Sequence, residues 1–208
     1  MKEKLFNLKI YLEFIRCFPH LLLFYFHKNK EIIKADVERW IEIYDLQRSE
    51  KQNFLYLLSF LPEFRNLFYY RIGVWKFLLN PICPQMSTLY ILTEKIGKGL
   101  FIQHGFATII AAKSIGDNCW VNQQVTIGFS NKTAAPDIND NVTINAGAKV
   151  IGGITVGKNS IIGANAVVVK NVPDNCTVVG VPAQIIRRNG VRVNPTDLFT
   201  ENDFNLIK

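Results

Sequence analysis

The sequence has 208 residues, of which 24 are Lys or Arg and 17 are Asp or Glu, giving a formal net charge of +7. No run approaches the ~18 consecutive apolar residues of a membrane-spanning helix, and the charged N-terminal stretch lacks the cleavage site of a secretory signal. We therefore expect a cytoplasmic protein. Because the basic residues are scattered and no nucleic-acid-binding motif occurs, we also expect that it does not bind DNA or RNA.

Residues 1–90 have the pattern of amphipathic helices. Most of the aromatic residues precede Ile96, and apolar side chains recur at helical spacing, for example at Val37, Trp40 and Tyr44. We predict an N-terminal helical segment over residues 1–90 that covers the exposed first edge of the segment that follows.

Basic residues border the aromatic stretches of this helical segment, at Lys4, Lys9, Arg16, Lys28 and Lys30. Such a border is typical of helices that lie in a membrane interface, whereas core packing and subunit contacts explain the aromatic residues equally well. Peripheral contact with the inner face of a membrane is therefore an alternative to a purely structural role.

A period of six residues dominates the second half of the sequence. Eleven hexads open with isoleucine or valine, and nine of them carry Gly or Asn three residues later. The hexads open at Ile96, Ile102, Ile109, Ile115, Val121, Ile138, Ile144, Val150, Val156, Ile162 and Val168. This period is typical of a parallel β-helix of triangular cross-section, which we predict for residues 91–187, with residues 188–208 as a C-terminal tail.

Two further positions of the hexad support this interpretation. The fifth position holds small or β-branched residues, which suit a narrow core: Cys119, Val125, Val142, Ala148, Ile154, Ser160 and Ala166. Gly and Asn at the fourth position tolerate the left-handed backbone conformation of a tight corner. The alternative, an ordinary β-sandwich, would have irregular strand spacing.

Two interruptions break the period. One residue is inserted between the hexads at Ile102 and Ile109, just after His104, and residues 129–137 leave the repeat before Ile138 resumes it. Excursions from a solenoid usually serve a binding or catalytic site, so we predict that both border a functional site. A tolerated surface insertion is the alternative for the longer excursion.

Several motifs in this order resemble the hexapeptide-repeat acyltransferases: IGKGLFIQHG (residues 96–105), NAGAKVIGG (145–153), IGANAVVVKNVP (162–173) and VGVPA (179–183). Within that family, the sequence is most similar to the serine acetyltransferase branch. The resemblance implies a left-handed parallel β-helix and transfer of an acetyl group from acetyl-CoA to a hydroxyl group. It also implies a homotrimer whose active sites lie between adjacent subunits.

His104 matches the catalytic histidine of the family, and the resemblance implies that it acts as a general base. An alcohol is a poor nucleophile at neutral pH, and an imidazole can accept its proton as the oxygen attacks the thioester. Glu94 or a backbone carbonyl is the expected partner that orients the imidazole. His20 and His27 lie in the helical segment and are expected to be structural.

The same resemblance implies a coenzyme A site. Ala146 and Ala164 match positions that are small so that the pantetheine arm can lie along a groove between subunits, and Gly128 would allow close approach to the thioester. Lys170 and Arg187 match basic positions that bind the phosphates of the coenzyme. For both basic residues, an ordinary solvated charge is the alternative.

The acceptor side departs from the serine acetyltransferases. Leu89 stands where these enzymes have the aspartate that orients the histidine, Gln103 replaces an acidic residue, and Ala134-Ala135 replace Arg-His. A site without charged partners would leave the ammonium and carboxylate groups of an amino acid poorly paired. We therefore predict a saccharide acceptor, such as a precursor of capsule, O-antigen or another surface glycan, with serine as the alternative.

Two other protein classes share this architecture. A hydratase of the γ-carbonic anhydrase type needs three histidine ligands for zinc, and His104 is the only histidine of the repeats, so we expect no metal. The four cysteines have no metal-like spacing and are expected to be reduced structural thiols: Cys17, Cys83, Cys119 and Cys176. A non-catalytic scaffold built from the same repeats is the remaining alternative.

Overall fold

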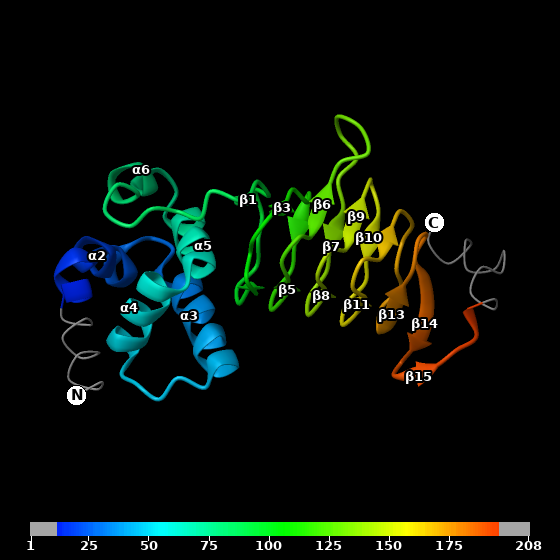
Figure 1. Ribbon diagram of the computed structural model, residues 1–208, viewed down its shortest axis with the longest axis horizontal. Coiled ribbons are helices and arrows are strands. Elements are labelled where there is room, and N and C mark those ends of the chain that lie inside the picture. The colour runs from blue at the N-terminus through cyan, green and yellow to red at the C-terminus, as the bar shows by residue number, and fades with distance from the viewer. Residues whose placement is uncertain (1–11, 196–208) are drawn as a thin grey trace.

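The computed structural model describes residues 12–195, which form a group of helices followed by a long β-solenoid (Figure 1). The helices stand at one end of the solenoid, and the chain then winds away from them in successive coils. Residues 12–16 are helical, and the helices that follow are α2 (Phe18–Phe26), α3 (Lys30–Tyr44), α4 (Glu50–Phe60), α5 (Pro62–Ile72), the 3-10 helix η1 (Gly73–Trp75) and α6 (Lys76–Leu79).

The local sequence sets the limits of several helices. α4 begins at a capping box, in which the Gln52 amide donates to Ser49 Oγ at 3.4 Å and the Ser49 amide donates to Gln52 Oε1 at 3.2 Å. Pro62 occupies the first turn of α5, where its missing N–H is not needed. Gly73 ends α5 with a φ of 60°, which a residue with a side chain rarely adopts.

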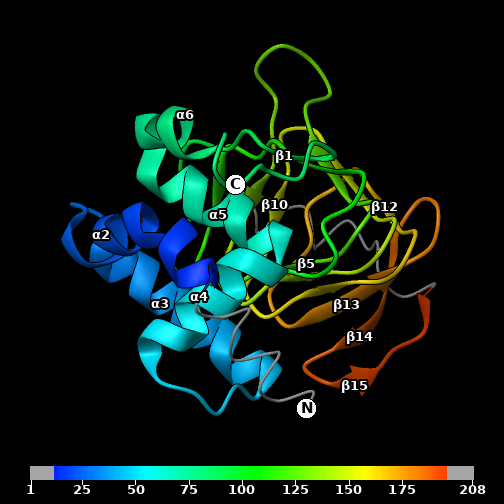
Figure 2. The same ribbon diagram turned by 60° about the vertical axis from the view of Figure 1, so that its left-hand side comes forward.

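An aromatic core joins the helices to the first coil of the solenoid. Trp40 on α3 packs against Phe101 with ring centroids 4.6 Å apart, and its indole N–H donates to the Leu100 carbonyl at 2.9 Å. Phe64 on α5 meets Trp40 edge-on at 5.2 Å. α3 and α5 both contact strands of the first coils, and Figure 2 shows the helices gathered at that end. The helices thus cover the first coil, as the sequence predicts.

Three sheets form the faces of a triangular prism. The first contains β1 (Leu89–Ile91), β3 (Thr108–Ile110), β6 (Thr126–Gly128), β9 (Lys149–Ile151) and β12 (Val167–Val168). The second contains β4 (Ser114–Ile115), β7 (Asp137–Ile138) and β10 (Thr155–Val156). The third contains β2 (Phe101–Ile102), β5 (Trp120–Val121), β8 (Thr143–Ile144), β11 (Ile161–Ile162), β13 (Cys176–Val179), β14 (Gln184–Arg188) and β15 (Val191–Arg192). Pairing is parallel up to β13, and β14 and β15 then add antiparallel strands.

The core of the prism follows the hexad. The residues at the fifth position are buried from Cys119 to Ala166, and so are the hexad openers except Ile109, which is 39% exposed. Ile110 is fully buried in its place, because the residue inserted after His104 shifts the phase and alternate residues of a strand face opposite sides. The prediction that a hexad opens at Ile109 is therefore wrong by one residue.

Most of the predicted corner residues have left-handed backbone conformations. Positive φ values occur at Gly99, Gly105, Asn118, Asn141, Gly147, Asn159 and Asn165. Among the described residues, Gly153 and Asn171 are the predicted corner positions without a positive φ. Along one corner, Asn141 Nδ2 donates to Asn159 Oδ1 at 3.1 Å and Asn159 Nδ2 donates to Asn175 Oδ1 at 3.0 Å. These side-chain bonds link successive coils.

The junction between helices and solenoid lies between Leu79, where α6 ends, and Leu89, where β1 begins. Strands β14 and β15 form a hairpin that extends past residue 187 into the segment predicted as a tail. Residues 196–208 lie outside the described part of the chain. The division of the chain at residues 90 and 187 stays a prediction.

No helix within residues 12–195 is long and apolar enough to cross a membrane. Helix α2 exposes Phe18, Leu22 and Phe26, which are spaced by four residues and therefore share one face. Two of the basic residues that suggest membrane contact, Lys4 and Lys9, lie outside the described residues. Peripheral membrane contact stays a prediction.

Candidate active site

His104 lies in the bend between β2 and β3. Its φ is 63°, and that of Ala107 in the same bend is 51°, both in the left-handed region that residues other than glycine rarely adopt. The Phe106 amide donates to the His104 carbonyl at 2.6 Å. The bend thereby accommodates the inserted residue and leaves His104 exposed at an edge of the prism.

Gly105 fixes the backbone next to His104. Its φ is 50°, and a Cβ atom at this position would lie 3.0 Å from Leu89 Cδ2 and 3.2 Å from Glu63 Cβ. Leu89 is buried, so the position that matches the family aspartate carries an apolar side chain packed beside the bend. Glu63 on α5 is also buried here. The sequence does not point to Glu63, because a helical pattern does not show which coil of the solenoid a helix will contact.

The register of the third sheet aligns His104 with two predicted coenzyme residues. The residues paired across successive coils are Ile102, Val121, Ile144 and Ile162. Two positions further along each coil lie His104, Gln123, Ala146 and Ala164, which together define the His104 edge. Since neighbouring coils are ~4.8 Å apart, Ala164 lies about 14 Å from His104 along this edge.

Small side chains leave the His104 edge open beyond Gln123. Ala146 is half-buried and Ala164 is exposed, and the coils that carry them are joined by a 2.9 Å hydrogen bond from the Asn165 amide to the Ala146 carbonyl. An extended ligand could therefore lie along the edge against backbone groups. The sequence motifs do not single out Gln123 either, although the hexad register counted from Val121 places it on the same edge as Ala146.

The other predicted coenzyme residues lie elsewhere. The strands of the first sheet begin near the His104 edge and lead away from it. Gly128 is the last residue of β6, and Lys170 comes two residues after the end of β12. Both therefore lie at the next edge of the prism, about 10 Å away across three residues of strand. Arg187 is exposed on β14, where it pairs with Thr177 of β13. A single chain does not bring these three residues to His104.

The loop of residues 129–136 projects from this next edge (Figure 1). Asn131 Oδ1 accepts a hydrogen bond from the Ala134 amide at 2.9 Å, which closes the tip of the loop. Ala135 is buried, and a Cβ atom added to Gly153 would lie 3.4 Å from Ala134 Cβ. Both alanines, which stand where the family has Arg-His, therefore fold back onto the prism.

Glu94 does not lie at the His104 edge. Strand β1 leads from that edge to the next one, and Glu94 follows its last residue, Ile91, by three positions. The Glu94 carbonyl accepts a hydrogen bond from the Tyr70 hydroxyl at 3.0 Å, and within the described chain its carboxylate has no hydrogen bond to His104. The structure does not support the prediction that Glu94 orients His104 in the same chain.

Comparisons with known proteins identify relatives of this architecture. Residues 136–170 match the family model described as bacterial transferase hexapeptide (six repeats). A serine acetyltransferase of Synechococcus elongatus is 39% identical over 160 residues, which cover 70% of this chain and 66% of that protein. The chain spans between half and two thirds of the length of the curated relatives it matches.

Solved structures extend the similarity to the helices. The serine acetyltransferase of Brucella abortus strain S19 in complex with coenzyme A has a TM-score of 0.63 and 29% identity, over 81% of this chain and 72% of that chain. The Neisseria gonorrhoeae serine acetyltransferase in complex with serine has a TM-score of 0.61 and 27% identity, over 79% of this chain and 72% of that chain. The predicted fold, a left-handed parallel β-helix behind N-terminal helices, is confirmed.

The saccharide acceptor predicted from the sequence is wrong. The relatives and solved structures named above are serine acetyltransferases, so serine, the alternative acceptor, fits these comparisons better. The prediction rested on the missing charges at Leu89, Gln103, Ala134 and Ala135. Leu89 and Ala135 are buried in the structure, so these positions do not reveal which polar groups an acceptor meets on the exposed surface.

The hexapeptide model by itself indicates only the repeat, because it matches the coils between residues 136 and 170. The similarity to serine acetyltransferases is broader, since it reaches 70% of the chain in sequence and 81% in structure. The chain therefore belongs to the serine acetyltransferase-like branch of the hexapeptide-repeat acyltransferases.

Proposed function

We propose that this protein is a serine O-acetyltransferase that moves the acetyl group of acetyl-CoA to the hydroxyl of serine. One observation carries the proposal: in a chain of this branch, a histidine with left-handed backbone conformation stands at an open edge lined by Ala146 and Ala164. The Brucella relative binds coenzyme A and the Neisseria relative binds serine, which supports both substrates.

In the proposed reaction, His104 accepts the proton of the serine hydroxyl as the oxygen attacks the thioester carbonyl. A tetrahedral intermediate forms and then collapses, breaking the C–S bond. The proton on the imidazole passes to the departing sulfur, so the products are O-acetylserine and coenzyme A. His104 is exposed in the single chain, which suits a residue that must meet two substrates.

The donor would lie along the His104 edge. The pantetheine arm is extended, and the His104 edge runs for about 14 Å from His104 to Ala164. The thioester could therefore lie near His104 while the arm lies along Ala146 and Ala164. Lys170 and Arg187 would bind the phosphates of the coenzyme. Because Gly128 and Lys170 lie at another edge of the same chain, we propose that a neighbouring subunit of a homotrimer supplies them.

The acceptor carries an ammonium and a carboxylate, which need polar partners when they leave water. Gln103 precedes His104 in the chain, and Gln123 lies next to His104 on the adjacent coil of the His104 edge. Both side chains are partly exposed. We propose that these amides contact serine in place of the charged groups expected from the family. Glu63 is buried, and its Cβ lies beside Gly105 in the same bend.

A thiol-release assay tests this function. Acetyl-CoA is incubated with the protein and serine, and free coenzyme A is measured against the background without acceptor. We expect release that depends on serine and a product with the mass of O-acetylserine. If acetyl-CoA binds but serine causes no release above background, the proposed activity is wrong and the scaffold alternative gains support.

A further inference from the structure

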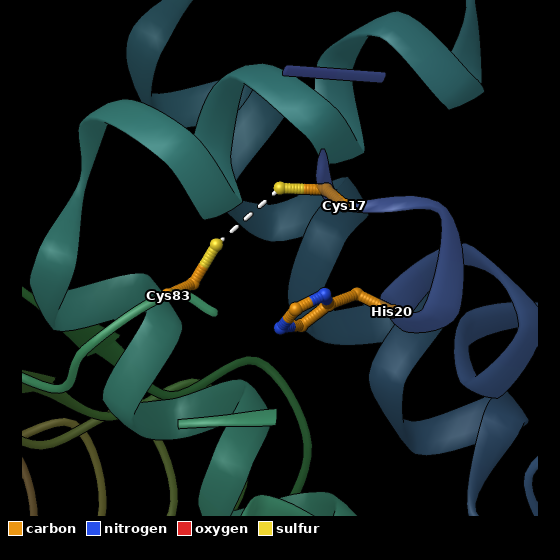
Figure 3. A group of neighbouring side chains, drawn as sticks. All are labelled: Cys17, His20 and Cys83. Carbon is orange, nitrogen blue, oxygen red and sulfur yellow. Dashed lines mark hydrogen bonds between the residues drawn. The ribbon is translucent and has the colours of Figure 1, made fainter. Parts of the chain in front are cut away.

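Three side chains that can act as metal ligands meet inside the helical segment (Figure 3). Cys17 lies just before α2, His20 is in the first turn of α2, and Cys83 follows α6. Each is fully buried, with no exposed side-chain surface. The two sulfur atoms are 3.5 Å apart, and one ligand atom from each of the three residues lies within 4.8 Å of the others.

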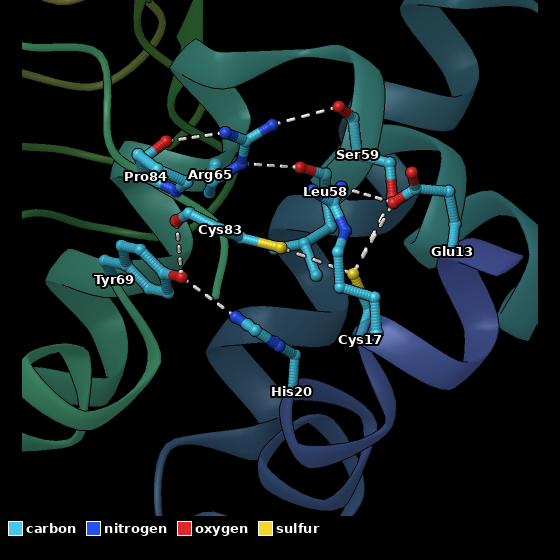
Figure 4. Close-up of polar contacts among 10 residues, drawn as sticks. Glu13, Cys17, His20, Leu58, Ser59, Arg65, Tyr69, Cys83 and Pro84 are labelled. Carbon is cyan, nitrogen blue, oxygen red and sulfur yellow. Dashed lines mark hydrogen bonds and ion pairs between the residues drawn. The ribbon is translucent and has the colours of Figure 1, made fainter. Parts of the chain in front are cut away.

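Hydrogen bonding fixes the tautomer of His20. The Tyr69 hydroxyl lies 2.8 Å from His20 Nε2 and 2.8 Å from the Cys83 carbonyl (Figure 4). It also lies 3.0 Å from the Leu79 carbonyl. Carbonyls only accept, so the single hydroxyl proton points to one of them and the hydroxyl accepts from Nε2–H. His20 Nδ1 therefore carries a lone pair, and this buried atom has no hydrogen-bond partner.

The surroundings hold this lone pair in place as a neutral acceptor. His20 is fully buried, and burial disfavours a charged imidazole. Arg65 donates to the carbonyls of Leu58, Ser59 and Pro84 at 2.8, 2.9 and 2.6 Å. These bonds tie the end of α4 to the segment that carries Cys83. An orphaned buried acceptor is unfavourable unless something binds it.

A metal ion would use all three groups. With ~2.3 Å bonds to sulfur and ~2.0 Å bonds to nitrogen, a tetrahedral Zn²⁺ separates two sulfur ligands by about 3.8 Å and sulfur from nitrogen by about 3.5 Å. The sulfur separation of 3.5 Å is close to the first value, and a nitrogen of His20 lies within 4.8 Å of each sulfur. A disulfide between Cys17 and Cys83 would leave His20 Nδ1 without a partner, so the lone pair favours a metal over a disulfide.

We propose that Cys17, His20 and Cys83 bind one Zn²⁺ ion that ties α2 to the start of the solenoid. Two thiolates and a neutral imidazole are ligands that zinc prefers, and the bond from Nε2–H to Tyr69 is the outer contact that such a histidine needs. The fourth position falls to water or to Glu13, whose Oε2 lies 3.9 Å from Cys17 Sγ. The role is structural, and it does not depend on the proposed acetyl transfer.

The test is metal content in the full-length protein. The protein is loaded with Zn²⁺ in a non-thiol reductant, desalted and analysed by mass spectrometry, and Co²⁺ is used in parallel for its thiolate charge-transfer absorption. We expect about one ion per chain and a cobalt spectrum with sulfur ligands. Cys17→Ser, Cys83→Ser and His20→Asn should lose the ion, whereas the matched controls Cys119→Ala and His27→Asn should keep it.

Variants of buried residues can fail to fold, so a second measurement uses the unmodified protein. Zn²⁺ should raise its melting temperature, and the same rise should occur in Cys119→Ala. The proposal is overturned if the unmodified protein retains no zinc and melts at the same temperature with and without it. It is also overturned if His20→Asn keeps the cobalt–thiolate spectrum, or if Cys17 and Cys83 are found as a disulfide in the reductant.

Discussion

Asp36 and Arg71 form a buried ion pair that joins two helices to the solenoid. Arg71 Nε donates to Asp36 Oδ2 at 2.7 Å and Arg71 Nη2 to Asp36 Oδ1 at 3.2 Å, with 3% and 2% of the two side chains exposed. Asp36 also accepts from the Gly99 amide at 2.7 Å, and Arg71 Nη1 donates to the Ile96 carbonyl at 2.7 Å. The pair therefore connects α3 and α5 to the first coil.

Replacing one partner should destabilise the protein strongly. In Arg71→Met, Asp36 is left as a buried carboxylate without its counter-ion, and we expect the free energy of unfolding to fall by about 3–5 kcal/mol. Urea unfolding followed by circular dichroism measures this. The control is Arg39→Ala, which removes an exposed ion pair with Glu42 and should cost less than about 1 kcal/mol. Equal effects in both variants would contradict the coupling role of Arg71.

Removing the imidazole of His104 should abolish most of the activity without unfolding the protein. In His104→Ala, kcat should fall at least ~100-fold, because no other described residue at the edge replaces a positioned base, while the KM for acetyl-CoA changes little. Steady-state kinetics with both substrates check this. A correctly folded variant that retains its kcat would exclude His104 as the base.

The bend beside His104 should not tolerate a side chain on Gly105. Gly105→Ala combines a left-handed φ, which costs about 1–2 kcal/mol, with contacts of 3.0 Å to Leu89 and 3.2 Å to Glu63. Gly190→Ala is a matched control, because its φ is 78° and no atom lies within 4 Å of the added Cβ. We expect Gly105→Ala to lower the melting temperature more than Gly190→Ala does; the reverse order would rule out the contacts as a cause.

A large side chain on the His104 edge should impair donor binding. Ala164→Leu places a branched side chain where the pantetheine arm would lie, so the KM for acetyl-CoA should rise at least ~10-fold, which corresponds to about 1.4 kcal/mol. The KM for the acceptor should change less. Thr155→Leu, an exposed change in the second sheet, should leave both values unchanged. Unaltered kinetics in Ala164→Leu would place the donor on another face.

The protein should be a homotrimer. Light scattering should give three times the chain mass of 23.7 kDa at micromolar concentration, because the residues proposed to bind the coenzyme lie at two different edges of one prism. Dilution should reduce specific activity as the trimer dissociates. A monomer with full activity would show that one chain completes its own site.

The sequence by itself determined the prism. A six-residue period sets which side chains face a narrow core, and this depends on local spacing alone, so Cys119, Val142 and Ala148 are buried as predicted. The same local rule failed at Ile109, which is exposed. The residue inserted after His104 shifts the repeat by one position, and nothing in the sequence at Ile109 shows that its side chain now points outward. The match of His104 to the family histidine also came from a local motif.

Tertiary structure decided the contacts between distant segments. Glu63 meets Gly105 and Asp36 meets Arg71 only because helices pack across the first coil, and no periodicity encodes that packing. Likewise, Cys17 and Cys83 show no metal-like spacing in the sequence, yet their sulfur atoms lie 3.5 Å apart. The spacing of a repeat is set by neighbouring residues, whereas a buried cluster is set by how whole elements dock, which depends on the summed packing of many side chains.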